Sequence, residues 1–245
     1  MKWRLLNTGF NNGAYNMKFD FNLVNSIKPS EAVLRFYRWK PYCISLGYNQ
    51  TAEDINKELA NADNIDVVTR PTGGRAILHA EELTYSIVLH NSSGMSNDEI
   101  YNLTSEALVK GLIFFDPVFN KLEKENLQPD FKKEYRKPES VLCFSSTARH
   151  EIKFEGKKII GSAQRKLANG LLQHGSILVG SYHKNIVKYL NVSSEKRNLI
   201  EKDTAAKTTE ISTIIGREIE YELLTEAIIN GFETVWGSKF YTQSD

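Results

Sequence analysis

The stretch 151–179 reads EIKFEGKKIIGSAQRKLANGLLQHGSILV and contains three strand-like runs separated by turn residues. The runs at 151–154, 158–162 and 171–179 are rich in residues that favour strands. Glu155-Gly156 predicts one hairpin turn. Asn169-Gly170 predicts the next, because Asn and Gly tolerate the positive φ that tight hairpin turns need. Strands joined this closely predict an antiparallel sheet region rather than a series of βαβ units.

The remaining sequence adds strands before this stretch and helices on both sides of it. Further strands are predicted at 32–39, 42–47, 65–69, 83–89 and 141–144. Helices are predicted at 52–61, from the Ser96–Glu99 capping box to about Phe115, and at 220–236. Residues 121–140 are polar and broken by two prolines, which predicts a long loop. We therefore expect an α+β fold, a mixed or antiparallel sheet flanked by helices, forming a single domain over residues 1–245.

Composition and charge exclude several classes of protein. The 245 residues carry 31 Lys and Arg against 30 Asp and Glu, a formal net charge of +1, whereas a general nucleic-acid binder is normally far more basic. No apolar run approaches the length of about 20 residues that a membrane-spanning helix needs. Two cysteines are too few for a disulfide framework or a cysteine zinc site, so no metal is expected. These features predict a cytoplasmic protein that binds neither nucleic acid nor membrane.

Charge is nevertheless uneven along the chain. Residues 121–166 contain twelve Lys and Arg against seven Asp and Glu. Such a stretch is either an ordinary solvated surface or a docking surface for an acidic partner. The sequence alone leaves both interpretations open.

Three segments place glycine beside polar side chains, where a backbone can approach a ligand. RPTGGRAILH (70–79) fits either a ligand-binding turn or a plain Gly-Gly hairpin. KKIIGSAQ (157–164) has lysines at the start of a strand, and LLQHGSI (171–177) has polar residues inside an apolar strand. Solvated lysines and a hydrogen-bonded core histidine would also explain these two segments. None of the three contains a nucleotide-binding pattern.

The two cysteines have different surroundings. Cys43 lies in an apolar strand with no charge beside it in sequence, which is typical of a small buried side chain. Cys143 follows the charged loop, and Arg149, His150 and two lysines come shortly after it. Neighbouring positive charge lowers a thiol pKa and favours the reactive thiolate.

Taken together, the runs RPTGGRAILHAEELTYS, CF, GKKIIGSAQR and LLQHGSI resemble the lipoate–protein ligase and biotin ligase superfamily. Within it, the sequence is most similar to the cysteine-dependent octanoyltransferases, over roughly residues 3–180. The resemblance implies a nucleophile at Cys143 and a catalytic lysine at Lys158. It also implies a set of substrate-binding residues, namely Arg70, Gly73, Gly74, His79, Gly161, Ser162, Ala163, His174 and Gly175. Relatives often carry Arg where this chain has Thr69, and Asp where it has Ala80, so head-group binding stays open.

The resemblance further implies a reaction without a bound cofactor. Octanoyl would move from octanoyl-acyl carrier protein to Cys143, and then to a lysine of a lipoyl-domain protein. Such an acceptor is the glycine cleavage H protein or the E2 subunit of a 2-oxoacid dehydrogenase. Acyl carriers are acidic, which favours the docking interpretation of the basic stretch.

Three alternatives remain open at this point. An ATP-dependent lipoate ligase would use Lys158 on an acyl-adenylate and leave Cys143 without a role. An amidotransferase would move octanoyl or lipoyl groups between carrier domains through the same cysteine. A non-catalytic acyl-domain binder belongs to a different class, with Thr69 and Ala80 as signs of a lost activity.

Overall fold

The structure is a computed structural model that describes residues 1–124 and 151–242. The strands are β1 (Lys2–Asn11), β2 (Glu31–Trp39), β3 (Cys43–Leu46), β4 (Asp66–Thr69), β5 (Ile77–His79), β6 (Glu82–His90), β7 (Leu122–Lys124), β8 (Ile152–Phe154), β9 (Lys157–Lys166), β10 (Gly170–Leu178) and β11 (Phe240–Thr242). The α-helices are α1 (Gly13–Ser26), α2 (Lys57–Ala62), α3 (Asn97–Phe115), α5 (Ser194–Lys207), α6 (Ile211–Ile215) and α7 (Tyr221–Trp236). Short 3-10 helices are η1 (Ala52–Asp54), η2 (Asn91–Ser93), η3 (Pro117–Lys121) and η5 (Ser181–Tyr189).

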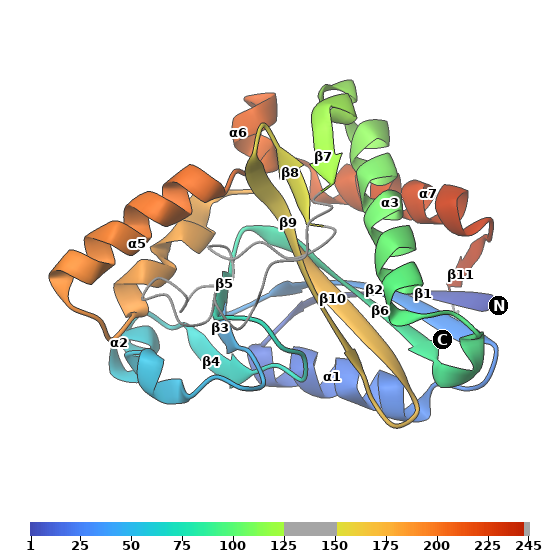
Figure 1. The fold of residues 1–245 in the computed structure, drawn as a ribbon, viewed down its shortest axis with the longest axis horizontal. Helices are drawn as coiled ribbons and strands as arrows, with labels where there is room; N and C mark the ends of the chain where they lie inside the picture. The colour runs from blue at the N-terminus through green and yellow to red at the C-terminus, as the bar shows by residue number, and fades with distance from the viewer. Residues whose placement is uncertain (125–150, 243–245) are drawn as a thin grey trace.

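The described strands form two sheets, an eight-stranded one in the order β11-β1-β2-β6-β10-β9-β8-β7 and a three-stranded one in the order β4-β3-β5 (Figure 1). In the large sheet β1 pairs in parallel with β2 and β11. Every other pair of neighbouring strands in this sheet is antiparallel. The small sheet is also mixed, since β3 is parallel to β4 and antiparallel to β5. The predicted α+β fold with a mixed sheet is confirmed.

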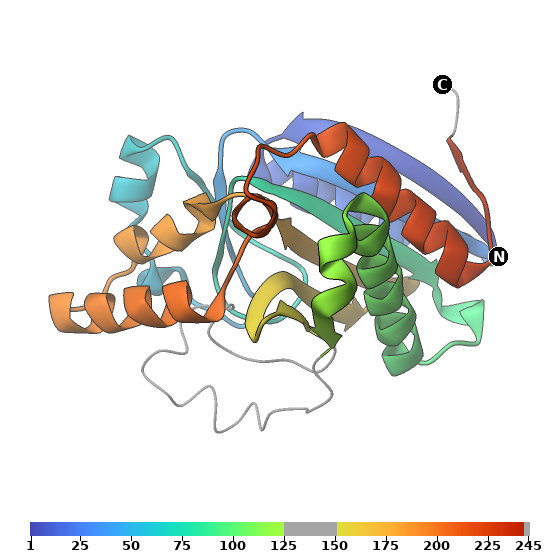
Figure 2. The ribbon, with the colours of Figure 1, turned by 90° about the horizontal axis from the view of Figure 1, so that it is seen from above.

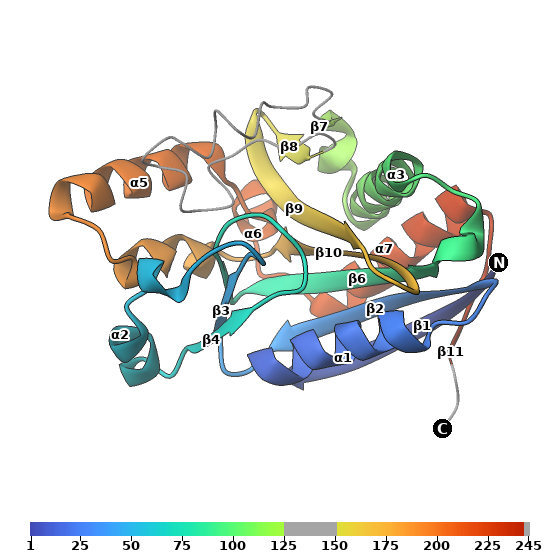
Figure 3. The same cartoon turned by 60° about the horizontal axis from the view of Figure 1, so that its bottom comes forward.

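Helices cover both faces of the large sheet. On one face α3 and α7 pack against each other and over the main hydrophobic core (Figure 2). On the other face α1 lies across β6 and β10 and also contacts β3 and β4 of the small sheet (Figure 3). Alternate strand residues explain the two layers, because a strand points successive side chains to opposite faces. On β2, for example, Leu34 and Phe36 enter the main core, whereas Val33 packs under α1.

Helix α3 follows from its sequence. Ser96 accepts a hydrogen bond from the Glu99 amide and the Glu99 carboxylate accepts one from the Ser96 amide, so the predicted capping box is present. The predicted C-terminal helix is also found, as α7, and it ends at Gly237, whose backbone is left-handed.

Several other predictions need correction. The single helix predicted at 52–61 is instead η1 followed by α2, because Asn56 caps a new helix with its side chain. The loop predicted over 121–140 begins with strand β7, which pairs with β8. The rest of that loop, the strand predicted at 141–144 and Cys143 lie outside the described residues. Strand β1, helix α1 and strand β5 were not predicted. Among the described residues, no helix is long and apolar enough to cross a membrane.

Candidate active site

Four neighbouring strands of the large sheet build the floor of a pocket on the α1 face. In the strand register Tyr37, Thr84, Ser176 and Gly161 form one row across β2, β6, β10 and β9. His174 and Ala163 lie in the adjacent row, two residues along β10 and β9. These six residues line the pocket together, although they come from four strands that are separate in sequence. The pocket therefore depends on the register of the sheet.

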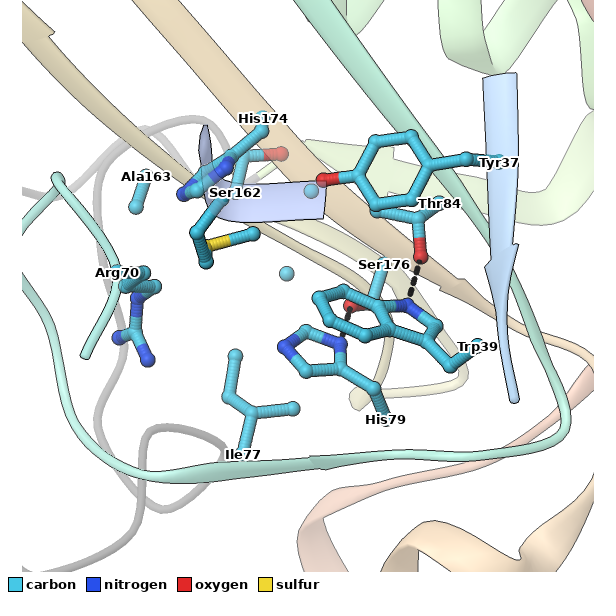
Figure 4. A pocket seen from close by; sticks show the side chains of 13 residues that line it. Tyr37, Trp39, Arg70, Ile77, His79, Thr84, Ser162, Ala163, His174 and Ser176 are labelled. Carbon is cyan, nitrogen blue, oxygen red and sulfur yellow. Dashed lines mark hydrogen bonds between the residues drawn. The ribbon is translucent and has the colours of Figure 1, made fainter. Parts of the chain in front are cut away.

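The other walls come from the small sheet, the end of β2 and α1. Ile77 and His79 contribute from β5, Trp39 from β2, Met17 from α1, and Arg70 from the turn after β4 (Figure 4). The Trp39 and His79 rings stack with centroids 4.1 Å apart. The space between the walls, including its open side, is about 350 Å³.

The polar groups in these walls are already paired with protein atoms. The Trp39 indole donates to the Thr84 hydroxyl at 2.7 Å, and the Tyr37 hydroxyl donates to Asp20 Oδ2 at 3.1 Å. Ser176 donates to Glu82 Oε1 at 2.8 Å. A ligand that brought its own polar groups would have to break such bonds, whereas a hydrocarbon chain would not. The pocket is therefore suited to an alkyl group.

Arg70 holds the Gly-rich turn rather than presenting a free charge to the pocket. Its guanidinium donates to the carbonyl oxygens of Ser45, Gly73 and Arg75 at 2.7–3.2 Å and to the Ser45 hydroxyl at 3.1 Å. Gly74 has φ +92°, and its carbonyl oxygen would lie 1.9 Å from a Cβ on Gly47. Gly73 and Gly74 therefore shape the turn without lining the pocket wall, unlike Arg70.

His79 is the centre of a buried polar chain. Its Nε2 lies 2.7 Å from the Ser45 hydroxyl and its Nδ1 lies 2.8 Å from Glu82 Oε1. Burial alone would raise the pKa of Glu82, but the His79 charge and three hydrogen bonds hold that pKa below its usual range. The Glu82 carboxylate therefore fixes the imidazole in one orientation. Ser45, although bonded to His79, does not line the pocket.

The other pocket histidine has a similar arrangement. His174 Nε2 lies 2.6 Å from the Thr72 hydroxyl, and its Nδ1 lies 3.7 Å from Asp20 Oδ2. Burial lowers the pKa of His174 despite the nearby Asp20 carboxylate, so the imidazole is neutral at pH 7. Asp20 is also bound by the buried Arg35 guanidinium at 2.7 Å. His174 is thus a hydrogen-bonded core histidine that also forms part of the pocket wall.

Lys158 is buried close to a carboxylate. It is 2% exposed, and its Nζ lies 2.5 Å from Glu151 Oε1, which is also buried. Lys157 beside it is exposed, as strand alternation predicts. Lys158 is the second residue of β9, three residues before Gly161, and does not itself line the pocket. Among the described residues, no cluster of His, Cys, Asp and Glu could hold a metal ion.

Cys43 has the buried position that its sequence predicts. It is fully buried in β3. Burial raises the pKa of its thiol well above the usual value, and the carboxylates of Asp66 and Glu82 raise it further. No charged neighbour was visible in the sequence, and the two that the fold brings near are negative. Both effects keep Cys43 protonated and unreactive.

The structure therefore brings most of the predicted site together. Of the predicted substrate-binding residues, the pocket is lined by Arg70, His79, Gly161, Ser162, Ala163, His174 and Gly175. Sequence reasoning missed further lining residues, namely Met17, Tyr37, Trp39, Ile77, Thr84 and Ser176. A possible signal for two of them is a polar residue inside an otherwise apolar strand, as Ser176 is in β10 and Thr84 is in β6. Position 80, where relatives often carry Asp, is a buried Ala in this chain. The carboxylate that bonds His79 comes from Glu82 instead.

Replacing Gly175 tests how closely β9 and β10 pack in the floor of the pocket. A Cβ there would lie 2.6 Å from the Gly161 carbonyl oxygen and 2.7 Å from the Tyr85 ring, so β9 and β10 would have to move apart. We expect Gly175→Ala to lower the free energy of unfolding by about 1–3 kcal/mol, as overpacking usually does. Gly73→Ala is the control, since its Cβ would meet nothing within 4 Å. Urea denaturation measures both, and equal stabilities would contradict this description of the floor.

Comparison with known proteins agrees with this geometry. Residues 12–233 match the lipoyl protein ligase A/B catalytic domain. The chain is 35% identical to octanoyltransferase LipM of Clostridioides difficile (strain 630), over 98% of this chain and 89% of that protein. It is 33% identical to octanoyltransferase LipM of Bacillus subtilis (strain 168), over 95% of this chain and 85% of that protein.

Solved structures share the fold at lower sequence identity. A lipoate-protein ligase A bound with ATP superposes with a TM-score of 0.77 at 22% identity, covering all of this chain and 90% of that one. A bipartite lipoate protein ligase from Thermoplasma acidophilum also gives 0.77 at 22% identity, covering all of this chain and 88% of that one. The predicted biotin/lipoate ligase-like fold is confirmed. The chain belongs to the lipoyl protein ligase A/B catalytic domain family and, within it, to the LipM octanoyltransferases.

Proposed function

We propose that this protein moves an octanoyl group from octanoyl-acyl carrier protein to a lysine of a lipoyl-accepting domain, through a thioester on Cys143. Membership of the LipM family supports the octanoyl transfer. The pocket carries the proposal on the structural side, because its polar wall groups are paired and an alkyl chain can occupy it without breaking them. Each methylene buried there would contribute about 0.8 kcal/mol to binding. We also propose that residues 1–245 act as a single catalytic domain.

The reaction proposed is two successive acyl transfers. The Cys143 thiolate attacks the carbonyl carbon of the donor thioester, the new S–C bond forms, and the carrier leaves as its thiolate, which takes up a proton. The acceptor amine then attacks the enzyme thioester, the Cys143 thiolate leaves, and the amine proton passes to solvent. Thioester exchange is close to thermoneutral and amide formation is downhill, so the sequence of steps consumes no ATP.

Lys158 is proposed as the group that stabilises negative charge during both transfers. Its ammonium is buried, and an interaction between charges strengthens where water is excluded. Glu151 holds the ammonium in place at 2.5 Å. Gly161 lies in the pocket wall without a side chain, which leaves room for the acyl chain beside this strand.

An assay with and without ATP tests the function. Mixed with octanoyl-acyl carrier protein and a lipoyl-accepting domain such as the H protein, the enzyme is expected to octanoylate the domain without ATP, as read by the mass of the domain. Transfer that requires free octanoate and ATP would identify a ligase instead. Transfer only from an octanoylated carrier domain would identify an amidotransferase, and no transfer at all would favour a non-catalytic binder.

The donor is proposed to dock on the basic stretch 121–166. Reversing the charges of Lys132, Lys133, Arg136 and Lys137, which lie outside the described residues, is expected to raise the KM for the carrier at low salt. The rise should shrink as salt is added, because salt screens exposed charges. Steady-state kinetics at two ionic strengths measure this effect. An unchanged KM at low salt would make the stretch an ordinary solvated surface.

A further inference from the structure

A second recess adjoins the pocket and shares two of its walls. We call it the outer groove. It is lined by Phe21 on α1, Tyr48, Pro71 and Leu167, together with Met17 and Arg70, which also line the pocket. Because the same two side chains face both spaces, they form the partition between them.

The order of residues along β9 shows which end of the pocket the outer groove adjoins. Lys158 is the second residue of the strand, Gly161 and Ala163 line the pocket, and Arg165 and Leu167, which follows the strand, line the outer groove. The seven residue steps from Lys158 to Arg165 extend for about 23 Å at the usual rise of a strand. If the thioester reacts near Lys158, as the proposed function requires, the methyl end of the acyl chain points towards the outer groove.

The two parts of the partition differ in rigidity. Arg70 is fixed by hydrogen bonds from all three of its guanidinium nitrogens to Ser45, Gly73 and Arg75. Met17 has a flexible thioether side chain, is 8% exposed, and packs against Tyr37 and Trp39. Shortening Met17 would therefore open the partition, whereas Arg70 would remain in place.

The outer groove has the chemistry to accept more hydrocarbon. Phe21 and Tyr48 are 45% and 57% exposed, so their apolar surfaces are accessible to a ligand. The Arg165 guanidinium lies 3.9 Å from the centre of the Tyr48 ring and donates to the Pro71 carbonyl at 2.7 Å. It thereby extends the flat surface over which an alkyl chain could lie.

We propose that Met17 limits the length of the acyl chain, and that the outer groove is a binding site for the methyl end of chains longer than octanoyl. This inference rests on the proposed function for the direction in which the chain lies. It assigns Met17 a role in substrate specificity and none in the chemical steps.

The test compares the binding of octanoate and decanoate by isothermal titration calorimetry. In the wild type, the two extra methylenes of decanoate meet the partition, so decanoate should bind no more tightly than octanoate. In Met17→Ala they enter the outer groove, and each buried methylene is worth about fourfold in affinity. We expect the ratio of the octanoate Kd to the decanoate Kd to rise by about fifteenfold over wild type. Met17→Leu, which keeps the volume, should leave that ratio unchanged.

Leu23→Ala is the matched control for damage to the helix. Leu23 is on α1, is also 8% exposed, and packs with Val33 and Leu172 away from both recesses. It should lose stability in a thermal melt as Met17→Ala does, while its Kd ratio stays at the wild-type value. An unchanged ratio in Met17→Ala, or an equal change in Leu23→Ala, would overturn the proposal. Because binding of free acids requires no transfer, a failure here is separable from a failure of the transferase assay.

Discussion

Replacing Cys143 by serine is expected to abolish acyl transfer, with a fall in kcat/KM of about 10³-fold or more, as usual when a nucleophile is removed. A serine hydroxyl remains protonated at neutral pH and is a far weaker nucleophile than a thiolate. The variant should still bind octanoate in the pocket, because the described lining residues come from other segments. Transfer kinetics and calorimetry measure the two properties separately.

Cys43→Ala is the matched control for this variant. The Cys43 side chain is fully buried, its thiol pKa is raised by burial and by Asp66 and Glu82, and it does not line the pocket. We expect Cys43→Ala to retain transfer within about twofold and to be destabilised only modestly, as for a small core truncation. Full activity in Cys143→Ser, or loss of activity in Cys43→Ala with the fold intact, would contradict the assignment of the nucleophile.

Removing the Lys158 charge is expected to have the second largest effect, on the enzyme's own acylation. A cation beside a thiol stabilises the thiolate, so its loss raises the thiol pKa. In Lys158→Met the pH profile of Cys143 alkylation should move to higher pH, and self-acylation at neutral pH should slow. Iodoacetamide kinetics against pH measure the shift. Lys157→Ala should be nearly silent, because Lys157 is exposed on the opposite face of the strand.

The Glu151 contact allows the structural and chemical effects of Lys158 to be separated. Lys158→Met alone leaves the buried Glu151 carboxylate without this partner, and breaking a buried pair usually costs about 3–5 kcal/mol of unfolding free energy. Adding Glu151→Gln removes that charge and should restore much of the stability. We expect the double variant to remain slow in self-acylation. If it recovers normal acylation together with its stability, Lys158 holds the fold and does not tune the nucleophile.

Elements with local signals were predictable from the sequence. Helix α3 begins with a complete capping box, and the turn between β8 and β9 contains Glu155 and Gly156, both with positive φ, so each is determined by a few neighbouring residues. Helix α1 begins with an Asn12 cap, but its apolar period is hard to recognise because Asn16 and Asp20 occupy its buried face. Asp20 is stable there because Arg35 on β2 pairs with it at 2.7 Å. That partner is 15 residues away, and only the folded structure brings it near.

Only the part of the pocket with a local sequence signal could be predicted. The glycines and histidines of the three motifs could be recognised because their sequence pattern is unusual. Tyr37, Thr84 and Ser176 could not, since they share a site only through the register of β2, β6 and β10. Register depends on pairings between distant segments, and a single sequence does not display them. The contact by which Glu82 holds His79 could likewise not be predicted from the sequence, because it depends on how the two side chains are oriented in the fold.

The most direct test of the proposed mechanism is the mass of the enzyme itself after incubation with octanoyl-acyl carrier protein in the absence of ATP. We expect a hydroxylamine-sensitive gain of one octanoyl group, and peptide mapping should assign it to the peptide that contains Cys143. Wild-type enzyme that octanoylates the acceptor domain but never carries the group itself would contradict a thioester mechanism. An adduct found on Cys43 would contradict the assignment of the nucleophile.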